Sequence, residues 1–132
     1  MRIQLASVIV DDQDKALTFY TEVLGFVEKA DIPIGEHRWR TVVSPDGPEG
    51  IELALEPIGF LPSRTYQESL FRAGTPAIAF ASDDLQAECE RLKEAGGVFR
   101  DEPADVGAAA HVLFEDTCGN LIRLYRSSDS PV

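Results

Sequence analysis

The residues best suited to chemistry are two acidic side chains in a segment that alternates like a β-strand. Glu52 and Glu56 are separated by an even number of positions, so both side chains point to the same side of an extended chain. Such a carboxylate can receive a cationic ligand group, or exchange protons together with a histidine. Glu52 and His111 are therefore the candidates for metal-free acid–base catalysis, although a histidine in a strand also serves as an ordinary hydrogen-bonding residue.

Three further residues have side chains that can hold a ligand without reacting with it. Trp39 and Tyr125 can stack on a planar or cationic group, and Arg123 carries a permanent positive charge. Plain packing against neighbouring side chains is the alternative for the two aromatic residues. The predicted ligand-binding set is Trp39, Glu52, Glu56, His111, Arg123 and Tyr125.

An internal repeat organises the segments that carry these residues. Two aspartates that precede helical patterns are 72 positions apart, and so are two turn glycines that lead into apolar strands. Such self-similarity indicates two copies of one structural unit. The offset matches Asp11 with Asp83, Gly47 with Gly119, Trp39 with His111 and Thr41 with Leu113.

Each copy predicts a strand, a helix and three further strands. Asp11 or Asp12 caps the first helix, which ends at Gly25, and Asp83 with Gln86 resembles a capping box for the second. The apolar side of the second helix is expected to hold Leu85, Cys89 and Leu92. The strands are expected at about 3–10, 26–30, 38–43, 50–56, 76–81, 97–100, 108–115 and 120–126.

The predicted fold belongs to the α+β class, with tandem βαβββ modules that form curled mixed sheets around a cleft. The 132 residues suffice for a single domain, with module one at about 1–56, module two at about 76–127 and a short polar tail. The linker at about 57–75 contains a short helix around 65–71.

Strand alternation separates an apolar face from a mixed one. The face beneath the helices is expected to hold Val8, Val10, Ile51, Leu53, Leu55, Ile78, Phe80, Ile122 and Leu124. The other face is expected to hold Leu5, Ser7, Glu52, Ala54, Glu56, Ala77, Ala79, Ala81, Arg123 and Tyr125. A face this small and this charged is poor core material, so it favours a concave surface that leaves room for a ligand.

The charge balance restricts the kinds of partner. Twelve Lys and Arg against 23 Asp and Glu give a net charge of −11, which disfavours nucleic acids and anionic membrane surfaces and favours a cationic or neutral small molecule. No apolar stretch is long enough to cross a bilayer and no signal peptide is visible, so a cytoplasmic protein is expected. Cys89 and Cys118 are the only cysteines and are expected to be free thiols.

The duplicated plan, the segment from Val10 to Phe26 and the closing turn Asp116-Thr117-Cys118-Gly119-Asn120 resemble the vicinal oxygen chelate superfamily. That superfamily comprises glyoxalase I, bleomycin-resistance proteins, fosfomycin-resistance enzymes and extradiol dioxygenases. The resemblance covers residues 3–126 and implies the glyoxalase/bleomycin resistance/dihydroxybiphenyl dioxygenase-like fold.

The resemblance also implies four metal-ligand positions, one in the first and one in the last strand of each module. They fall on Leu5, Glu52, Ala77 and Arg123, of which Glu52 alone has a ligating side chain. We therefore expect no metal and no other cofactor. Glu52 and Arg123 are hypothesised to form an ion pair in place of the metal, within one chain or between two. Two separately solvated side chains are the alternative.

The bleomycin-resistance branch of the superfamily fits the loss of metal ligands best, because the resemblance implies that those proteins bind their ligands without a metal. The leading hypothesis is a homodimer that binds a small molecule in a metal-free cleft and sequesters a toxic or antibiotic compound. One alternative is an enzyme, either a glyoxalase-like lyase or isomerase or a metal-independent acid–base catalyst. The other is a non-catalytic accessory subunit.

Overall fold

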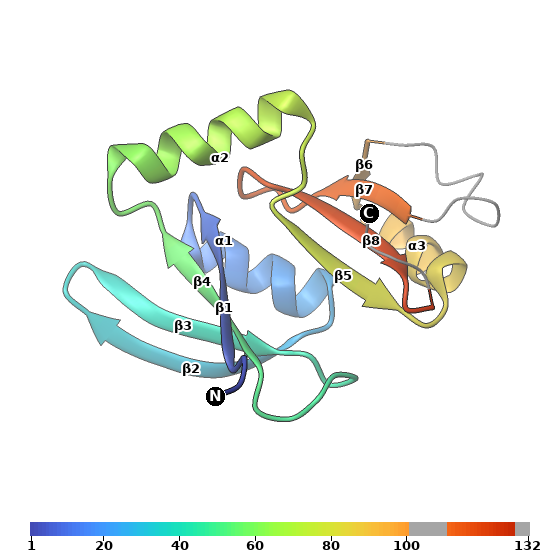
Figure 1. Ribbon diagram of the computed structural model, residues 1–132, viewed down its shortest axis with the longest axis horizontal. Helices are drawn as coiled ribbons and strands as arrows, with labels where there is room; N and C mark the ends of the chain where they lie inside the picture. Colours follow the sequence, from blue (N-terminus) through green and yellow to red (C-terminus); the bar gives the residue numbers. More distant parts are fainter. Residues whose placement is uncertain (101–110, 129–132) are drawn as a thin grey trace. The chain divides into compact units, whose positions relative to one another are not determined.

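The computed structural model describes residues 1–100 and 111–128. The chain divides into two compact units, Met1–Thr65 and Tyr66–Val132, and each is described by itself (Figure 1). The boundary between the units falls inside the predicted linker. No helix among the described residues is long and apolar enough to span a membrane.

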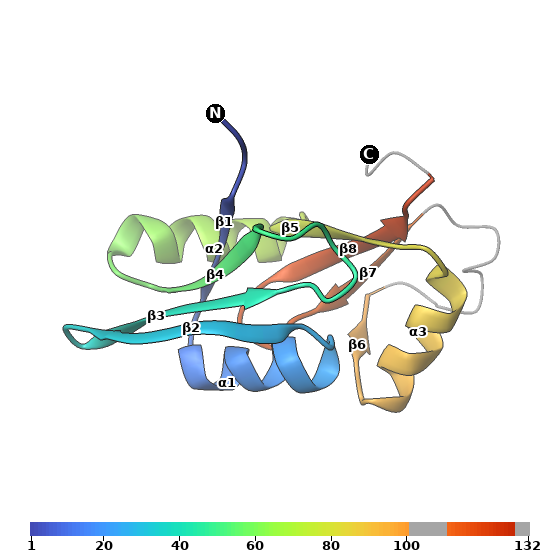
Figure 2. The ribbon, with the colours of Figure 1, turned by 90° about the horizontal axis from the view of Figure 1, so that it is seen from below.

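The first unit contains a four-stranded sheet and one helix that lies along a face of it (Figure 2). The strands are arranged in the order β1-β4-β3-β2, with β1 and β4 parallel and the other neighbours antiparallel. The elements are β1 (Leu5–Val10), α1 (Gln13–Thr18), the π-helical segment η1 (Phe19–Val23), β2 (Val27–Ile34), β3 (His37–Val43) and β4 (Glu52–Pro57).

The second unit repeats this plan. Its strand order is β5-β8-β7-β6, again with one parallel pair and antiparallel neighbours. The elements are β5 (Ile78–Ser82), α3 (Leu85–Glu94), β6 (Val98–Phe99), β7 (His111–Glu115) and β8 (Leu121–Arg126). The prediction of two βαβββ modules in an α+β fold is therefore confirmed. Residues 108–110 of the strand predicted at 108–115 lie outside the described residues.

Both helices start at aspartates, but the second does not start as predicted. Asp12 caps α1, where its side chain accepts hydrogen bonds from the backbone of Asp14 and Lys15, and Gly25 ends the helical stretch at φ 83°. The cap of α3 is Asp84, which accepts from the backbone N–H of Ala87. The predicted capping box is wrong because Asp83 instead accepts a 2.7 Å hydrogen bond from the hydroxyl of Ser127.

The apolar face of each sheet meets its helix largely as predicted. In the first unit, Val8, Val10 and Leu55 are buried together with Ala16 and Tyr20 from the helical stretch. In the second unit, the buried set is Leu85, Cys89, Leu92, Val112, Phe114, Ile122 and Leu124. Ile51 is an exception: it precedes β4 and is 41% exposed, so its assignment to the core is wrong.

The inner strands of the two sheets match with the predicted offset. Thr41 of β3 lies opposite Ala54 of β4, and Leu113 of β7 lies opposite Arg123 of β8. The ends of β3 and β7 are 72 residues apart, whereas the starts of β4 and β8 are 69 apart, because the connection at 44–51 is longer than the one at 116–120. The predicted matches of Trp39 with His111 and of Thr41 with Leu113 therefore agree with the strand positions.

A helix occupies most of the predicted linker. This helix, α2 (Leu61–Ala73), is longer than the one expected at 65–71. Its buried Gln67 donates hydrogen bonds to the carbonyl of Cys118 (3.1 Å) and to Oδ1 of Asn120 (3.4 Å). Buried Asp116 closes the same turn by accepting from the backbone of Cys118 and from both the backbone and the side chain of Asn120. The second half of α2 is thus fastened to the β7–β8 turn.

Candidate functional site

Glu52 lies at the start of β4 with its carboxylate tied to the neighbouring strand. It is opposite Leu5 of β1, and its Oε1 accepts a 2.7 Å hydrogen bond from the hydroxyl of Thr41 on β3. Thr41 is completely buried and Glu52 is half-buried. Because the donor cannot reach water, the hydroxyl is committed to the carboxylate and fixes its position.

Glu56 lies on the same face as Glu52, as strand alternation predicts. The hydroxyl of Ser7 on β1 lies 3.4 Å from Oε1 of Glu56, to which it donates. The two carboxylates are therefore bound to opposite neighbours of β4, Glu52 to β3 and Glu56 to β1. This leaves oxygen lone pairs of both half-buried groups available above the sheet.

Trp39 adds an aromatic ring to this face of the first sheet. It is two residues from Thr41 on β3, so the two side chains point to the same side. Across the strand pair it lies opposite Ile32 of β2, which is 54% exposed. One face of the first unit therefore presents an aromatic ring, an exposed aliphatic side chain and two carboxylates, which together suit an organic molecule with an apolar body.

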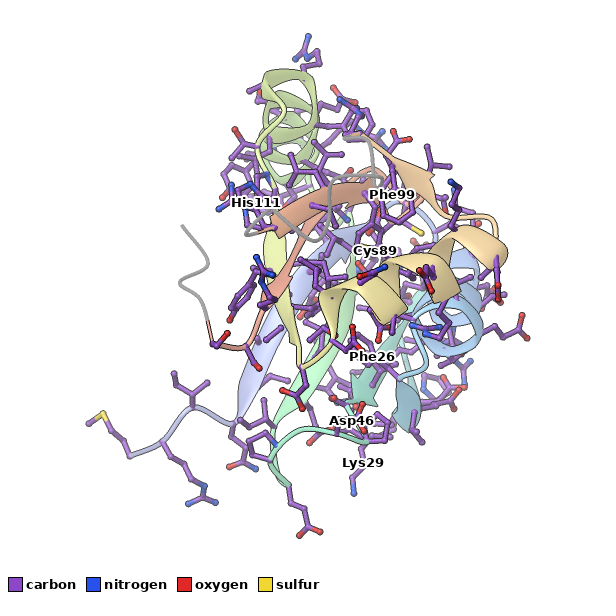
Figure 3. All side chains as sticks on the ribbon, turned by 90° about the vertical axis from the view of Figure 1, so that its right-hand side faces the viewer. Phe26, Lys29, Asp46, Cys89, Phe99 and His111 are labelled. Atoms are coloured by element: carbon purple, nitrogen blue, oxygen red, sulfur yellow. The ribbon has the colours of Figure 1, made fainter. Side chains whose placement is uncertain are left out.

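The other three predicted site residues lie on one face of the second unit. His111, labelled in Figure 3 at the first residue of β7, is opposite Tyr125, and Tyr125 is next to Ala81 of β5. One row further along the sheet, Arg123 lies between Leu113 and Ala79. His111, Tyr125 and Arg123 are half-buried, whereas the alanines of β5 are exposed. Short side chains along β5 leave space beside the three larger residues.

The four positions that bind metal in the superfamily do not provide a metal site here. Leu5 and Glu52 are neighbours in register, but Leu5 has no donor atom and is 46% exposed. Ala77, just before β5, also lacks a donor, and Arg123 is a cation. Among the described residues, no three His, Cys, Asp or Glu side chains gather in a way that could hold an ion. The residues present do not fit a divalent metal.

The predicted site residues thus form two groups. Trp39, Glu52 and Glu56 belong to the first unit, and His111, Arg123 and Tyr125 belong to the second. The hypothesised ion pair between Glu52 and Arg123 joins the two groups and stays a prediction.

Thr41 and Ser7 are the site residues that the predicted ligand-binding set lacked. Alternation assigns Ser7 to the mixed face, but it does not connect the hydroxyl of Ser7 or that of Thr41 to a carboxylate. The pairing of strands decides those contacts, since Thr41 reaches Glu52 from β3 and Ser7 reaches Glu56 from β1. A strand-order prediction that placed β4 between β1 and β3 would have found both.

The fold and the duplicated sheets agree with the comparisons to known proteins. Residues 2–124 match the Glyoxalase/Bleomycin resistance protein/Dioxygenase superfamily, and the chain belongs to this family. It is 48% identical over 124 residues to YurT of Bacillus subtilis (strain 168), covering 94% of this chain and 98% of YurT.

Two solved structures resemble the chain over nearly its whole length. The crystal structure of UcmS2 has a TM-score of 0.79 at 31% identity and covers 96% of this chain and 98% of UcmS2. TnmS3, an antibiotic binding protein from Streptomyces sp. CB03234, has a TM-score of 0.67 at 29% identity and covers 96% of this chain and 95% of TnmS3.

Proposed function

We propose that this protein binds a small organic molecule without a metal and sequesters it, with an antibiotic or other toxic compound as the ligand. The observation that carries the proposal is the identity of the four superfamily metal positions. Three of them hold Leu5, Ala77 and Arg123, none of which can ligate a cation. The likeness to TnmS3, an antibiotic binding protein, supports the same conclusion.

The ligand class we propose is cationic or neutral. The chain carries a net charge of −11, which attracts cations and repels anions at a distance. At short range, Glu52 and Glu56 offer carboxylate oxygens on the face that also holds Trp39. A positive group can meet the carboxylates while an apolar or planar part contacts the ring.

A binding experiment on the full chain tests this proposal. Differential scanning fluorimetry and isothermal titration calorimetry are run with bleomycin as the cationic probe, a neutral anthraquinone and fosfomycin as the anionic probe. We expect bleomycin or the anthraquinone to raise the melting temperature, since a ligand selective for the folded state stabilises it, and fosfomycin to have no effect. EDTA should leave the shift unchanged.

The enzyme alternative is tested in the same preparation. The chain is assayed with the hemithioacetal of methylglyoxal and glutathione, before and after addition of Ni²⁺ or Zn²⁺. We expect no turnover in either case. Metal-dependent turnover, or a tightly bound stoichiometric metal in the purified protein, would overturn the proposal.

A matched pair of variants locates the binding face. Glu52→Gln removes one charge without changing shape, and Glu49→Gln makes the same change at an exposed residue in the turn before β4. We expect Glu52→Gln to weaken binding of bleomycin roughly ten- to a hundredfold, the range for loss of a hydrogen bond to a charged group. Glu49→Gln should leave the affinity within error of the unmodified chain.

A further inference from the structure

The sheet of the first unit has a gap at the strand that carries Trp39. In the described part of the chain, β3 pairs with β4 at Thr41–Ala54 and Val42–Leu53. Continuing that register by three residues would place Pro57 opposite Arg38. Proline has no N–H, so it cannot donate to the carbonyl of Arg38 and complete the ladder.

The side chain of Gln13 fills this gap. Gln13 is the first residue of α1, and its Nε2 donates to the carbonyl of Arg38 (2.7 Å) and to that of Leu55 (2.8 Å). Its Oε1 accepts from the backbone N–H of Arg38 at 3.1 Å. A primary amide has one acceptor and two donor hydrogens, so it can act as a short piece of strand between β3 and β4.

Ion pairs hold Arg40, the residue that follows Trp39 on β3. Arg40 is 6% exposed, and its guanidinium lies 2.7 Å from Oδ1 of Asp14, the second residue of α1. It also lies 3.4 Å from Asp31 on β2, which is paired with Arg38 as well. The two neighbours of Trp39 are therefore fixed, Arg38 by its backbone and Arg40 by its buried side chain.

We infer that Gln13 is a positioning residue for Trp39, and that α1 holds this ring in place for ligand binding through the backbone of Arg38. This inference rests on the proposed function, because it assigns Trp39 to the binding face. Among the residues that the structure describes, the ring of Trp39 has no hydrogen-bond partner that could orient it, so the backbone of β3 decides where the ring lies. A ring held in place before binding loses less conformational freedom when the ligand arrives.

The sequence offers a direct spectroscopic test, since Trp39 is the only tryptophan among the 132 residues. Its fluorescence is measured in the ligand-free chain by acrylamide quenching and by time-resolved anisotropy. Acrylamide is neutral, so the net charge of −11 does not bias its approach. The variants are Gln13→Ala, Gln13→Met, which keeps the side-chain length, and Gln86→Ala, which removes an exposed glutamine from the first turn of α3.

We expect both Gln13 variants to raise the quenching constant of Trp39 and to lower its anisotropy, while far-UV circular dichroism stays unchanged. Gln86→Ala should behave as the unmodified chain does. Unchanged quenching and anisotropy in a folded Gln13 variant would overturn the inference. If Gln13→Ala does not fold, the longer Gln13→Met variant gives the result.

A second readout separates the inference from the proposed function. If bleomycin binds the unmodified chain, Gln13→Met should weaken its binding roughly two- to tenfold, the cost of ordering a freed side chain. Binding of equal strength would show that the position of the ring is irrelevant to the ligand and would also overturn the inference. If no probe binds the unmodified chain, the proposed function fails, but the quenching experiment still decides whether Gln13 positions Trp39.

Discussion

The completely buried hydroxyl of Thr41 donates a 2.7 Å hydrogen bond to Oε1 of Glu52. Glu52 occupies the one superfamily metal position that keeps a ligating side chain. In a metal site this carboxylate would contact the ion, whereas here it contacts Thr41 on the adjacent strand. The carboxylate therefore remains ordered without a metal, with lone pairs left for another group.

Replacing Thr41 should reveal the strength of this contact. Thr41→Val keeps the shape of the side chain but removes the donor, so we expect the free energy of unfolding to fall by about 1 kcal/mol. Urea denaturation followed by circular dichroism measures the change. Thr41→Ser keeps the hydroxyl and should recover the part due to the hydrogen bond. Equal stability of Thr41→Val and the unmodified chain would contradict this prediction.

Asp31 should make the stability of the chain depend on acidic pH. The hydrogen bond from Arg38, together with the charge of Arg40, lowers the pKa of Asp31 below its ordinary value of 3.8. A carboxyl group with a lowered pKa takes up a proton more readily when the chain unfolds. Its stabilising contribution is therefore present above the unfolded-state pKa and is lost as pH falls through the folded-state pKa.

Melting temperatures measured from neutral pH down to about pH 3, at constant ionic strength, test the contribution of Asp31. We expect Asp31→Asn to be less stable than the unmodified chain at neutral pH and to lose less stability on acidification. Asp46→Asn is the control, because Asp46 lies in the exposed turn after β3 (Figure 3). Parallel pH profiles for Asp31→Asn and the unmodified chain would be inconsistent with the ion pairs.

Gly119 and Gln67 should be energetically coupled. A Cβ at Gly119 would lie 2.8 Å from Cδ of Gln67, and the backbone there has φ +98°. Gly119→Ala should therefore cost about 2 kcal/mol, part from the clash and part from the backbone. In a Gln67→Ala background only the backbone part remains, so the cost should be smaller. Chemical denaturation of the four chains of this cycle gives the coupling, and strictly additive effects would refute it.

The two thiols should be unreactive in the folded chain. Cys89 and Cys118 are both free and buried, and burial, reinforced by the charge of Glu88, raises the pKa of Cys89 to about 11. Since the thiolate is the reactive form, we expect negligible reaction with Ellman's reagent at mildly alkaline pH and reaction of both thiols after unfolding. Rapid labelling of the native chain would disprove the burial of these residues.

The arrangement of the helices and strands follows from local patterns in the sequence. Asp12 and Gly25 bracket the first helical stretch because a side-chain cap and a left-handed glycine act on their immediate neighbours. Leu85, Cys89 and Leu92 lie on the buried side of α3 because helical spacing brings them to one face. Alternation likewise placed Glu52 and Glu56 on one face.

Local sequence patterns could not predict the contacts between segments that are far apart in the chain. The choice of Asp84 over Asp83 as a cap depends on Ser127, which lies 44 positions from Asp83 along the chain. The role of Gln13 depends on Pro57 at the end of another strand, and no local signal marks a glutamine as a substitute for backbone. Residues 44–51 form a longer connection than their counterpart, so the offset of 72 that holds between β3 and β7 falls to 69 between β4 and β8.

The attachment of Gln67 to the β7–β8 turn has a consequence for dividing the molecule. The sequence repeat places the boundary between the two copies close to residue 76, where the first strand of the second module is predicted. A fragment started there would leave the Cys118 carbonyl and the Asn120 amide without the glutamine that they contact. The boundary of the sequence repeat therefore differs from the boundary of the compact unit, because the second unit includes the end of α2.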